Sequence, residues 1–251
     1  MLDFKRNEDI VYDFCSKNIS QNLNHWNYIN RYSKWMFHLY SDYIGETVFD
    51  VGAGMGRMVE FYIESVKNVV AIDIFQNQIN YMNKRFQNYS YFRAIKKDIL
   101  KDDLSEYKGC FDTVICINVL EHLSNDFLAV KNMRSILRDE GTLILMVPAF
   151  QKLYCQLDIN VNHYRRYNPG RLCNIARKNG MRVVKHHYFN MMGIIPYWIK
   201  GKKKLKKDES FSSSLNGYNS KIYNFAAGIF EPIEKYFPPK VGLTEFMVLR
   251  R

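Results

Sequence analysis

The chain of 251 residues is 47% hydrophobic, which suffices for one α/β domain with a sizeable core and some additions. Its five cysteines are odd in number and include no C-x-x-C pair, which argues against a disulfide or zinc framework and favours a reducing cytosol. No stretch reaches the roughly 18 apolar residues that span a bilayer, and residues 1–7 lack the apolar run of a signal peptide. The net charge of +11 favours an anionic partner, such as nucleic acid, a phosphorylated substrate or a membrane surface, with a generally basic surface as the alternative.

The N-terminal part predicts helices. Residues 1–24 are polar and predict a short helix with a loose lead-in, whereas residues 25–43 carry aromatic and apolar side chains at helical spacing. Two roles stay open for Tyr32 and Trp35 on this second helix: packing on the core, or covering the mouth of a ligand site.

The organising stretch follows. Residues 48–51 predict a short buried strand, three alternate glycines come next, and residues 58–63 predict a helix. Glycine allows a sharp turn and a close approach of ligand to the main chain, and the helix start offers free N–H groups. This order predicts a loop that binds a nucleotide-like ligand.

The glycine spacing selects the ligand class. A nicotinamide fingerprint, G-x-G-x-x-G, needs its third glycine at position 57, where this chain has Arg57. The next predicted strand, residues 69–73, ends in Asp73, whose carboxylate can accept both hydroxyls of a ribose.

The sequence Asp50-Val-Gly-Ala-Gly-Met-Gly56 followed by Asp73 resembles motif I and its successor in the class I S-adenosylmethionine (SAM) methyltransferases, of type 11/12. The resemblance implies SAM as cofactor and S-adenosylhomocysteine as product. It also implies that Asp98, just after the third strand, accepts a hydrogen bond from the adenine amino group, with a turn-capping aspartate as the alternative. The cofactor contacts that it implies are Asp50, Gly52, Ala53, Gly54, Gly56, Asp73, Ile74, Asp98, Ile99 and Asn118, with Tyr32 and Trp35 as covering residues.

Strands and helices then alternate. Strands are predicted at residues 91–96, 111–118 and 141–147, and helices at 75–86 and 125–137. Such alternation predicts parallel βαβ units with helices on both faces and ligand sites at the carboxyl ends of the strands.

The end of the fourth strand, Asn118-Val-Leu-Glu-His122, resembles motif IV, where the methionine part of the cofactor meets the substrate. Glu121 and His122 are therefore candidate catalytic residues, with support of the pocket as the alternative role.

The segment after the fifth strand holds the candidate residues for binding the acceptor substrate. Asp158 and the run His163-Tyr-Arg-Arg-Tyr167 resemble a stretch of a bacterial methyltransferase subgroup that modifies sugars, glycolipids or natural products. His163 can act as a base near neutral pH or anchor the loop. Arg165 and Arg166 can hold an acidic acceptor or form structural ion pairs. The predicted substrate-binding residues are Asp158, Arg165, Arg166 and Tyr167, and the predicted catalytic residues are His163, Glu121 and His122.

The last third predicts a helix from an N-cap at Asn168 to a stop at residues 179–180, a strand at 182–189, a helix at 218–237 and an antiparallel last strand at 244–250. Between them, an aromatic and lysine-rich stretch at residues 189–207 favours either contact with an anionic membrane or a pocket cap with a solvated loop.

We therefore predict one α/β domain: a doubly wound, mostly parallel seven-stranded Rossmann-like sheet with an N-terminal helical cap and an insertion before the last strand. Its parts are the cap (1–44), the core (45–190), the insertion (191–240) and the last strand (241–251). The predicted function is methyl transfer from SAM to a hydroxyl or amine of a small or conjugated acceptor. An RNA methyltransferase and a non-catalytic SAM-binding module are the alternatives, no metal is expected, and the predicted location is the cytoplasm, with the inner membrane surface as an alternative.

Overall fold

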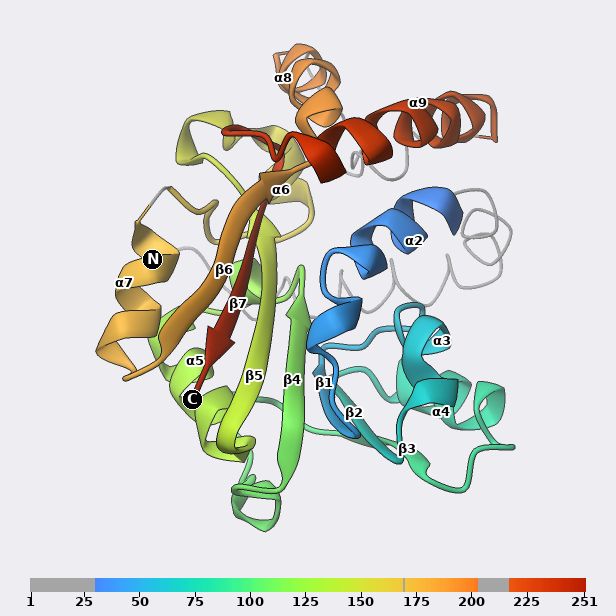
Figure 1. The fold of residues 1–251 in the computed structure, drawn as a ribbon, viewed down its shortest axis with the longest axis vertical. Coiled ribbons are helices and arrows are strands. Elements are labelled where there is room, and N and C mark those ends of the chain that lie inside the picture. Colours follow the sequence, from blue (N-terminus) through green and yellow to red (C-terminus); the bar gives the residue numbers. More distant parts are fainter. Residues whose placement is uncertain (1–29, 169, 203–216) are drawn as a thin grey trace.

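The computed structural model describes residues 30–168, 170–202 and 217–251. Its seven strands form one sheet in the order β3-β2-β1-β4-β5-β7-β6. β1 to β5 pair in parallel, and β7 runs antiparallel between β5 and β6 (Figure 1). The predicted doubly wound sheet with an antiparallel last strand is confirmed. The strands are β1 Thr47–Val51, β2 Asn68–Asp73, β3 Phe92–Lys96, β4 Phe111–Ile117, β5 Leu137–Pro148, β6 Arg182–Phe189 and β7 Thr244–Arg250.

Eight α-helices and six short 3-10 helices connect the strands within the described residues. The α-helices are α2 Asn30–His38, α3 Val59–Tyr62, α4 Gln76–Arg85, α5 Asp126–Ile136, α6 Gln156–Asn160, α7 Arg171–Lys178, α8 Ile194–Gly201 and α9 Gly217–Tyr236. The 3-10 helices are η1 Ser41–Tyr43, η2 Ile63–Ser65, η3 Ser105–Tyr107, η4 Leu120–His122, η5 Gln151–Leu153 and η6 Met191–Gly193. The predictions for residues 1–29, Pro169 and 203–216 lie outside the described residues.

Helices cover both faces of the sheet because successive strand residues point to opposite sides. On one face, Phe49 and Val114 pack in a core shared with α5 and α7. On the other face, Val48 and Ile115 pack in a core shared with α2, α3 and α4. Figure 1 shows α5 and α7 on one side of the sheet and α2, α3 and α4 on the other. Burial on both faces explains why these strands have nearly continuous apolar sequences.

The start of α7 differs from the prediction. The helix begins at Arg171, and its N-cap is Gly170, which has a left-handed φ of 88°. The predicted cap, Asn168, instead accepts a hydrogen bond from the backbone N–H of Gln151 at 2.9 Å. The side-chain carbonyl of Asn168 thus binds the backbone of Gln151 and stabilises the loop before α7, so it does not cap the helix.

Gly52 and Gly109 have the same left-handed backbone conformation, but only Gly52 is closely packed, so substitutions at the two positions distinguish backbone strain from steric overlap. Gly52 has φ +68°, and a Cβ added there would lie 2.4 Å from Val119 Cγ2, whereas Gly109 has φ +70° and open space around it. Both alanine substitutions should cost about 1–2 kcal/mol for the left-handed backbone. Gly52→Ala should cost a further ~1–3 kcal/mol for the overlap with Val119. Urea unfolding of both variants measures the difference, and equal losses of stability would contradict the tight packing at Gly52.

Candidate cofactor and acceptor site

The glycine loop after β1 has one open position. Gly52, Gly54 and Gly56 all have left-handed φ angles of 58–71°. A Cβ at Gly52 or Gly56 would meet a neighbouring side chain at 2.4 or 2.5 Å, but at Gly54 the nearest atom outside the adjacent residues is Gln78 Oε1, 4.0 Å away. Gly52 and Gly56 therefore serve close packing, and Gly54 is the position where a ligand can approach the main chain.

Asp73, at the end of β2, faces this loop. Its carboxylate oxygens accept hydrogen bonds from the N–H groups of Gly54 (2.9 Å) and Phe75 (3.0 Å). The side-chain amide of Gln78, in the orientation that satisfies its surroundings, donates to both oxygens at 3.0 and 2.9 Å. Burial raises the pKa of Asp73, although the backbone hydrogen bonds oppose this effect. A carboxylate that accepts two donors from one group matches the two hydroxyls of a ribose, so the site fits the nucleoside that motif I implies.

Asp50, on β1, is buried and accepts a hydrogen bond from the Tyr62 hydroxyl at 2.7 Å. Burial raises the pKa of Asp50 to about 7, and the nearby charge of Asp73 adds to this rise, although the Tyr62 bond opposes it. Two carboxyl groups at neighbouring strand ends thus make this edge of the sheet favourable for a cationic group.

The remaining predicted cofactor contacts lie at the same strand ends. Ile74 is 52% exposed and offers an apolar surface beside Asp73, whereas Ile99 is buried. Asp98 accepts a hydrogen bond from the N–H of Leu100 at 2.8 Å, which is the turn geometry of the alternative prediction. Ala53 is half-buried in the glycine loop, and Asn118 has a left-handed φ of 54° just after β4. Direct contact of these residues with SAM stays a prediction.

The covering aromatics of α2 pack on the end of β6. Trp35 is buried, and the centre of its ring lies 4.5 Å from the centre of the Phe189 ring. The ring of Tyr32 stacks on the same phenylalanine, with 5.4 Å between ring centres. Their neighbour Ser33 accepts a hydrogen bond from Arg57 of the glycine loop at 2.6 Å. The packing role accounts for both aromatic residues, and a contact with the cofactor stays a prediction.

On the acceptor side, Asp158 of α6 is fully buried and accepts four hydrogen bonds. The donors are His163 Nδ1 (2.9 Å), Arg166 Nε (2.8 Å), the Tyr197 hydroxyl (2.8 Å) and the Cys155 N–H (3.0 Å). Burial alone would raise the pKa of Asp158, but the His163 bond and the Arg166 charge outweigh burial and hold it below its ordinary value. Because an ionised carboxylate only accepts, His163 carries a proton on Nδ1, and in the neutral form of the ring Nε2 presents a lone pair.

The other predicted acceptor ligands also contact protein groups. Arg166 is buried, donates to the Ala149 carbonyl at 3.1 Å and lies over the Tyr197 ring. Arg165 donates to two backbone carbonyls just after η4, at 2.7 and 3.0 Å. Tyr167 is buried, and its hydroxyl donates to the Leu120 carbonyl at 3.2 Å. These contacts are those of structural residues, and acceptor binding by them stays an untested prediction.

The three predicted catalytic residues come together. Glu121 and His122 lie on η4, and the loop that carries His163 is attached to η4 by the Tyr164 N–H, which donates to the Glu121 carbonyl at 2.8 Å. His163 Nε2 lies 3.9 Å from Glu121 Oε1, and the two imidazole rings are 4.6 Å apart. Burial raises the pKa of Glu121 to about 7. Sequence reasoning found these three residues but missed Tyr197, since no local pattern connects α8 with α6.

This cluster adjoins the glycine loop. Gly52 packs directly against Val119, which precedes η4, and β1 is the neighbour of β4 in the sheet. The strand order reverses between these two strands, which is where open α/β sheets bind ligands. The glycine loop and the Glu121–His122–His163 cluster thus lie at the same edge of the sheet, as the predicted site requires.

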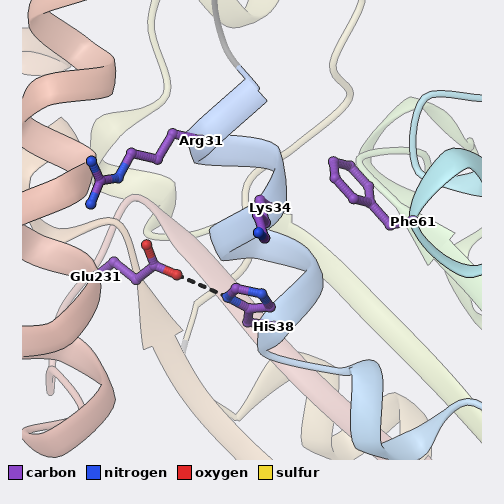
Figure 2. Close-up of a pocket in the computed structure, with 5 residues that line it drawn as sticks. All are labelled: Arg31, Lys34, His38, Phe61 and Glu231. Atoms are coloured by element: carbon purple, nitrogen blue, oxygen red, sulfur yellow. Dashed lines mark hydrogen bonds and ion pairs between the residues drawn. The ribbon is translucent and has the colours of Figure 1, made fainter.

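A separate pocket of about 630 Å³ lies between α2, α3 and α9. It is lined by Arg31, Lys34, His38, Phe61 and Glu231, and His38 Nδ1 lies 2.9 Å from Glu231 (Figure 2). Within the described residues it shares no lining side chain with the predicted site.

The outer surface of α8 is apolar. Ile195, Trp198 and Ile199 are 67%, 49% and 48% exposed, and Lys202 Nζ lies 3.5 Å from the centre of the Trp198 ring. Within the described part of the chain, no helix is both long and apolar enough to cross a bilayer. Membrane contact through residues 189–207 stays a prediction, since residues 203–207 lie outside the described ranges.

Comparison with known proteins agrees with this geometry. Residues 49–143 match the model of a methyltransferase domain family. The chain is 29% identical over 101 residues to the ubiquinone biosynthesis O-methyltransferase of Xanthomonas campestris, which is 40% of this chain and 42% of that protein. It is 27% identical over 105 residues to a probable (S)-tetrahydroprotoberberine N-methyltransferase of Papaver bracteatum, which is 40% of this chain and 28% of that protein. The chain thus spans less than half the length of these relatives.

Solved structures share the fold at low identity. A SAM-dependent methyltransferase from Archaeoglobus fulgidus superposes with a TM-score of 0.59 at 17% identity, over 88% of this chain and 94% of that one. The [4+2]-cyclase SpnF superposes with a TM-score of 0.58 at 13% identity, over 88% and 80%. The match to the methyltransferase-domain family over residues 49–143 and the sheet topology show that the chain has the class I SAM-dependent methyltransferase fold. SAM is the cofactor that this family implies, and Gly54 and Asp73 fit it.

The open position at Gly54 predicts a selective binding defect. Gly54→Ala should weaken binding of S-adenosylhomocysteine by about 1–3 kcal/mol, because its methyl group would occupy the space into which the ligand fits. Gly109→Ala is the matched control, since it carries the same backbone strain away from the site. Isothermal titration calorimetry measures both, and unchanged affinity in Gly54→Ala would mean that the ligand does not approach this glycine.

The buried ion pair predicts a large loss of stability. Arg166→Met should destabilise the protein by about 3–5 kcal/mol, because it leaves the Asp158 charge buried without its partner. Lys67→Met removes a surface pair with Glu46 at 2.7 Å and should cost less than about 1 kcal/mol. Chemical unfolding compares the two variants, and similar small losses would show that Arg166 is not needed to balance Asp158.

Proposed function

We propose that this chain transfers the methyl group of SAM to a hydroxyl oxygen of a small or conjugated acceptor, such as a sugar, glycolipid or natural product. The observation that carries the proposal is the Glu121–His122–His163 cluster, which lies beside the glycine loop and contains a lone pair on His163 Nε2. A hydroxyl must lose its proton when it is methylated, and this cluster offers groups that can assist that loss.

SAM supplies a methyl group that is already activated on a sulfonium, so the protein's main task is to orient the acceptor. The hydrogen bond from His163 Nδ1 to Asp158 fixes the ring and its tautomer. The exposed His122 and the partly exposed His163 leave the cluster open to an acceptor. The O-methyltransferase and the N-methyltransferase among the relatives support methyl transfer, and between them they leave both oxygen and nitrogen open as the acceptor atom.

The chemistry is tested by incubating the protein with SAM and pooled metabolite, glycolipid and RNA fractions, followed by mass spectrometry for a gain of a methyl group. A methylated small molecule or glycolipid supports the proposal. A methylated RNA would establish the alternative that the net charge suggests. Binding of SAM without any product would favour a non-catalytic module or another reaction. The fold is shared, at 13% identity, by a protein that is named a [4+2]-cyclase.

His163→Ala should lower turnover by roughly 10²–10⁴-fold, because the acceptor loses assistance in deprotonation, while affinity for S-adenosylhomocysteine stays constant. His186→Ala is a suitable control, since His186 also pairs with a buried glutamate, Glu245, at 2.9 Å but lies on β6. Full activity in His163→Ala would remove this residue from the mechanism, and a loss of cofactor binding would assign the loop a structural role.

A further inference from the structure

We propose that Glu121, His122 and His163 form a binding site for one divalent first-row transition metal ion. One carboxylate oxygen of Glu121 and one ring nitrogen of each histidine all lie within 4.8 Å of one another. Two imidazoles and one carboxylate are a donor set that suits Zn²⁺, Fe²⁺ or Mn²⁺. No metal was predicted from the sequence, since its cysteines have no metal-ligand spacing and the third ligand of this set, His163, comes from a separate loop.

Glu121 and His163 do not satisfy each other's hydrogen-bonding groups. The distance of 3.9 Å between His163 Nε2 and Glu121 Oε1 is too long for a hydrogen bond. Glu121 Oε2 is buried and has no hydrogen-bond partner among the described residues. The buried carboxylate of Glu121 is therefore left without these hydrogen bonds, and a cation placed among the three groups would satisfy it.

Both histidines are held as metal-bound histidines usually are. His163 donates its Nδ1–H to the Asp158 carboxylate, and His122 is hydrogen-bonded to the backbone of Asn162. In metal sites the second ring nitrogen is held in this way by a carboxylate or a carbonyl, which fixes the tautomer that binds the ion.

The spacing of the three donor groups and their exposure to solvent also suit a metal ion. Metal–ligand bonds of about 2.0–2.2 Å place donor atoms roughly 3–3.5 Å apart, so the three side chains need to close by about an ångström around the ion. Only three protein ligands are present, which leaves coordination positions for water or an acceptor oxygen. Because His122 is exposed and His163 partly exposed, the ion can enter from solvent.

The role of the ion rests on the proposed function. An ion here would coordinate the acceptor hydroxyl and lower its pKa, so that oxygen is methylated as its alkoxide or phenolate and the proton passes to solvent. In the metal-bound protein His163 Nε2 is a ligand of the ion, so His163 assists the loss of the proton through the ion and not as a base itself. The acceptor would then be an oxygen ligand for a metal, such as a phenol or a vicinal diol.

The binding test uses the full chain after treatment with EDTA, in the absence of SAM and acceptor. Titration with Co²⁺ should give visible absorption bands that saturate at one ion per chain, and Zn²⁺ should displace the cobalt. Mg²⁺ should bind much more weakly, because it prefers oxygen ligands.

Glu121→Gln and His122→Asn should each weaken Co²⁺ binding by more than about 100-fold, which exceeds the usual effect of changing an outer partner of a ligand. His186→Asn, at the β6 pair, should bind as the unaltered protein does. Because His122 is exposed, His122→Asn keeps the test informative if Glu121→Gln fails to fold, as judged by circular dichroism. The proposal is overturned if the unaltered protein does not bind Co²⁺ or Zn²⁺, or if His122→Asn binds them equally well. Because the titration contains neither SAM nor acceptor, its result is independent of the test of methyl transfer.

Discussion

Four hydrogen-bond donors converge on the buried carboxylate of Asp158, and the acceptor side of the molecule is arranged around it. The donors come from the N-cap of α6, from the loop that follows α6 and from α8, so one charged group joins three segments. The cost of burying this charge is offset because every acceptor position of the carboxylate is filled and Arg166 supplies the opposite charge. The orientation of His163 is a consequence of this arrangement.

The sheet could be predicted from sequence because its physical determinants are local. The apolar runs of β1, β2 and β4 reflect burial on both faces, and the polar residues that follow them, such as Asp73 and Asn118, lie at one edge by the geometry of parallel strands. The cap of α7 could not be predicted in the same way, because the side chain of Asn168 bonds to Gln151 of another turn.

The site was predicted as a set of residues but not as an arrangement. The residue types of Arg165 and Arg166 suggested acceptor binding, since sequence gives the charge of a side chain and not the direction in which it points. In the structure both guanidinium groups turn inward to carbonyls or to Asp158. Conversely, the closeness of His163 to Glu121 depends on how a loop returns to the end of β4, which no spacing in the sequence encodes.

Tyr197 links the buried carboxylate to a helix whose outer surface is apolar. The same helix, α8, carries Tyr197, which donates to Asp158, and the exposed residues Ile195 and Trp198. The two faces of α8 therefore share one conformational equilibrium. Any molecule that binds the outer face and displaces the helix must alter the support of His163, and by thermodynamic reciprocity a ligand that orders His163 must alter affinity at the outer face. The hydroxyl of Tyr197 thus connects binding at the outer face of α8 to the hydrogen bonds of Asp158 and to the orientation of His163.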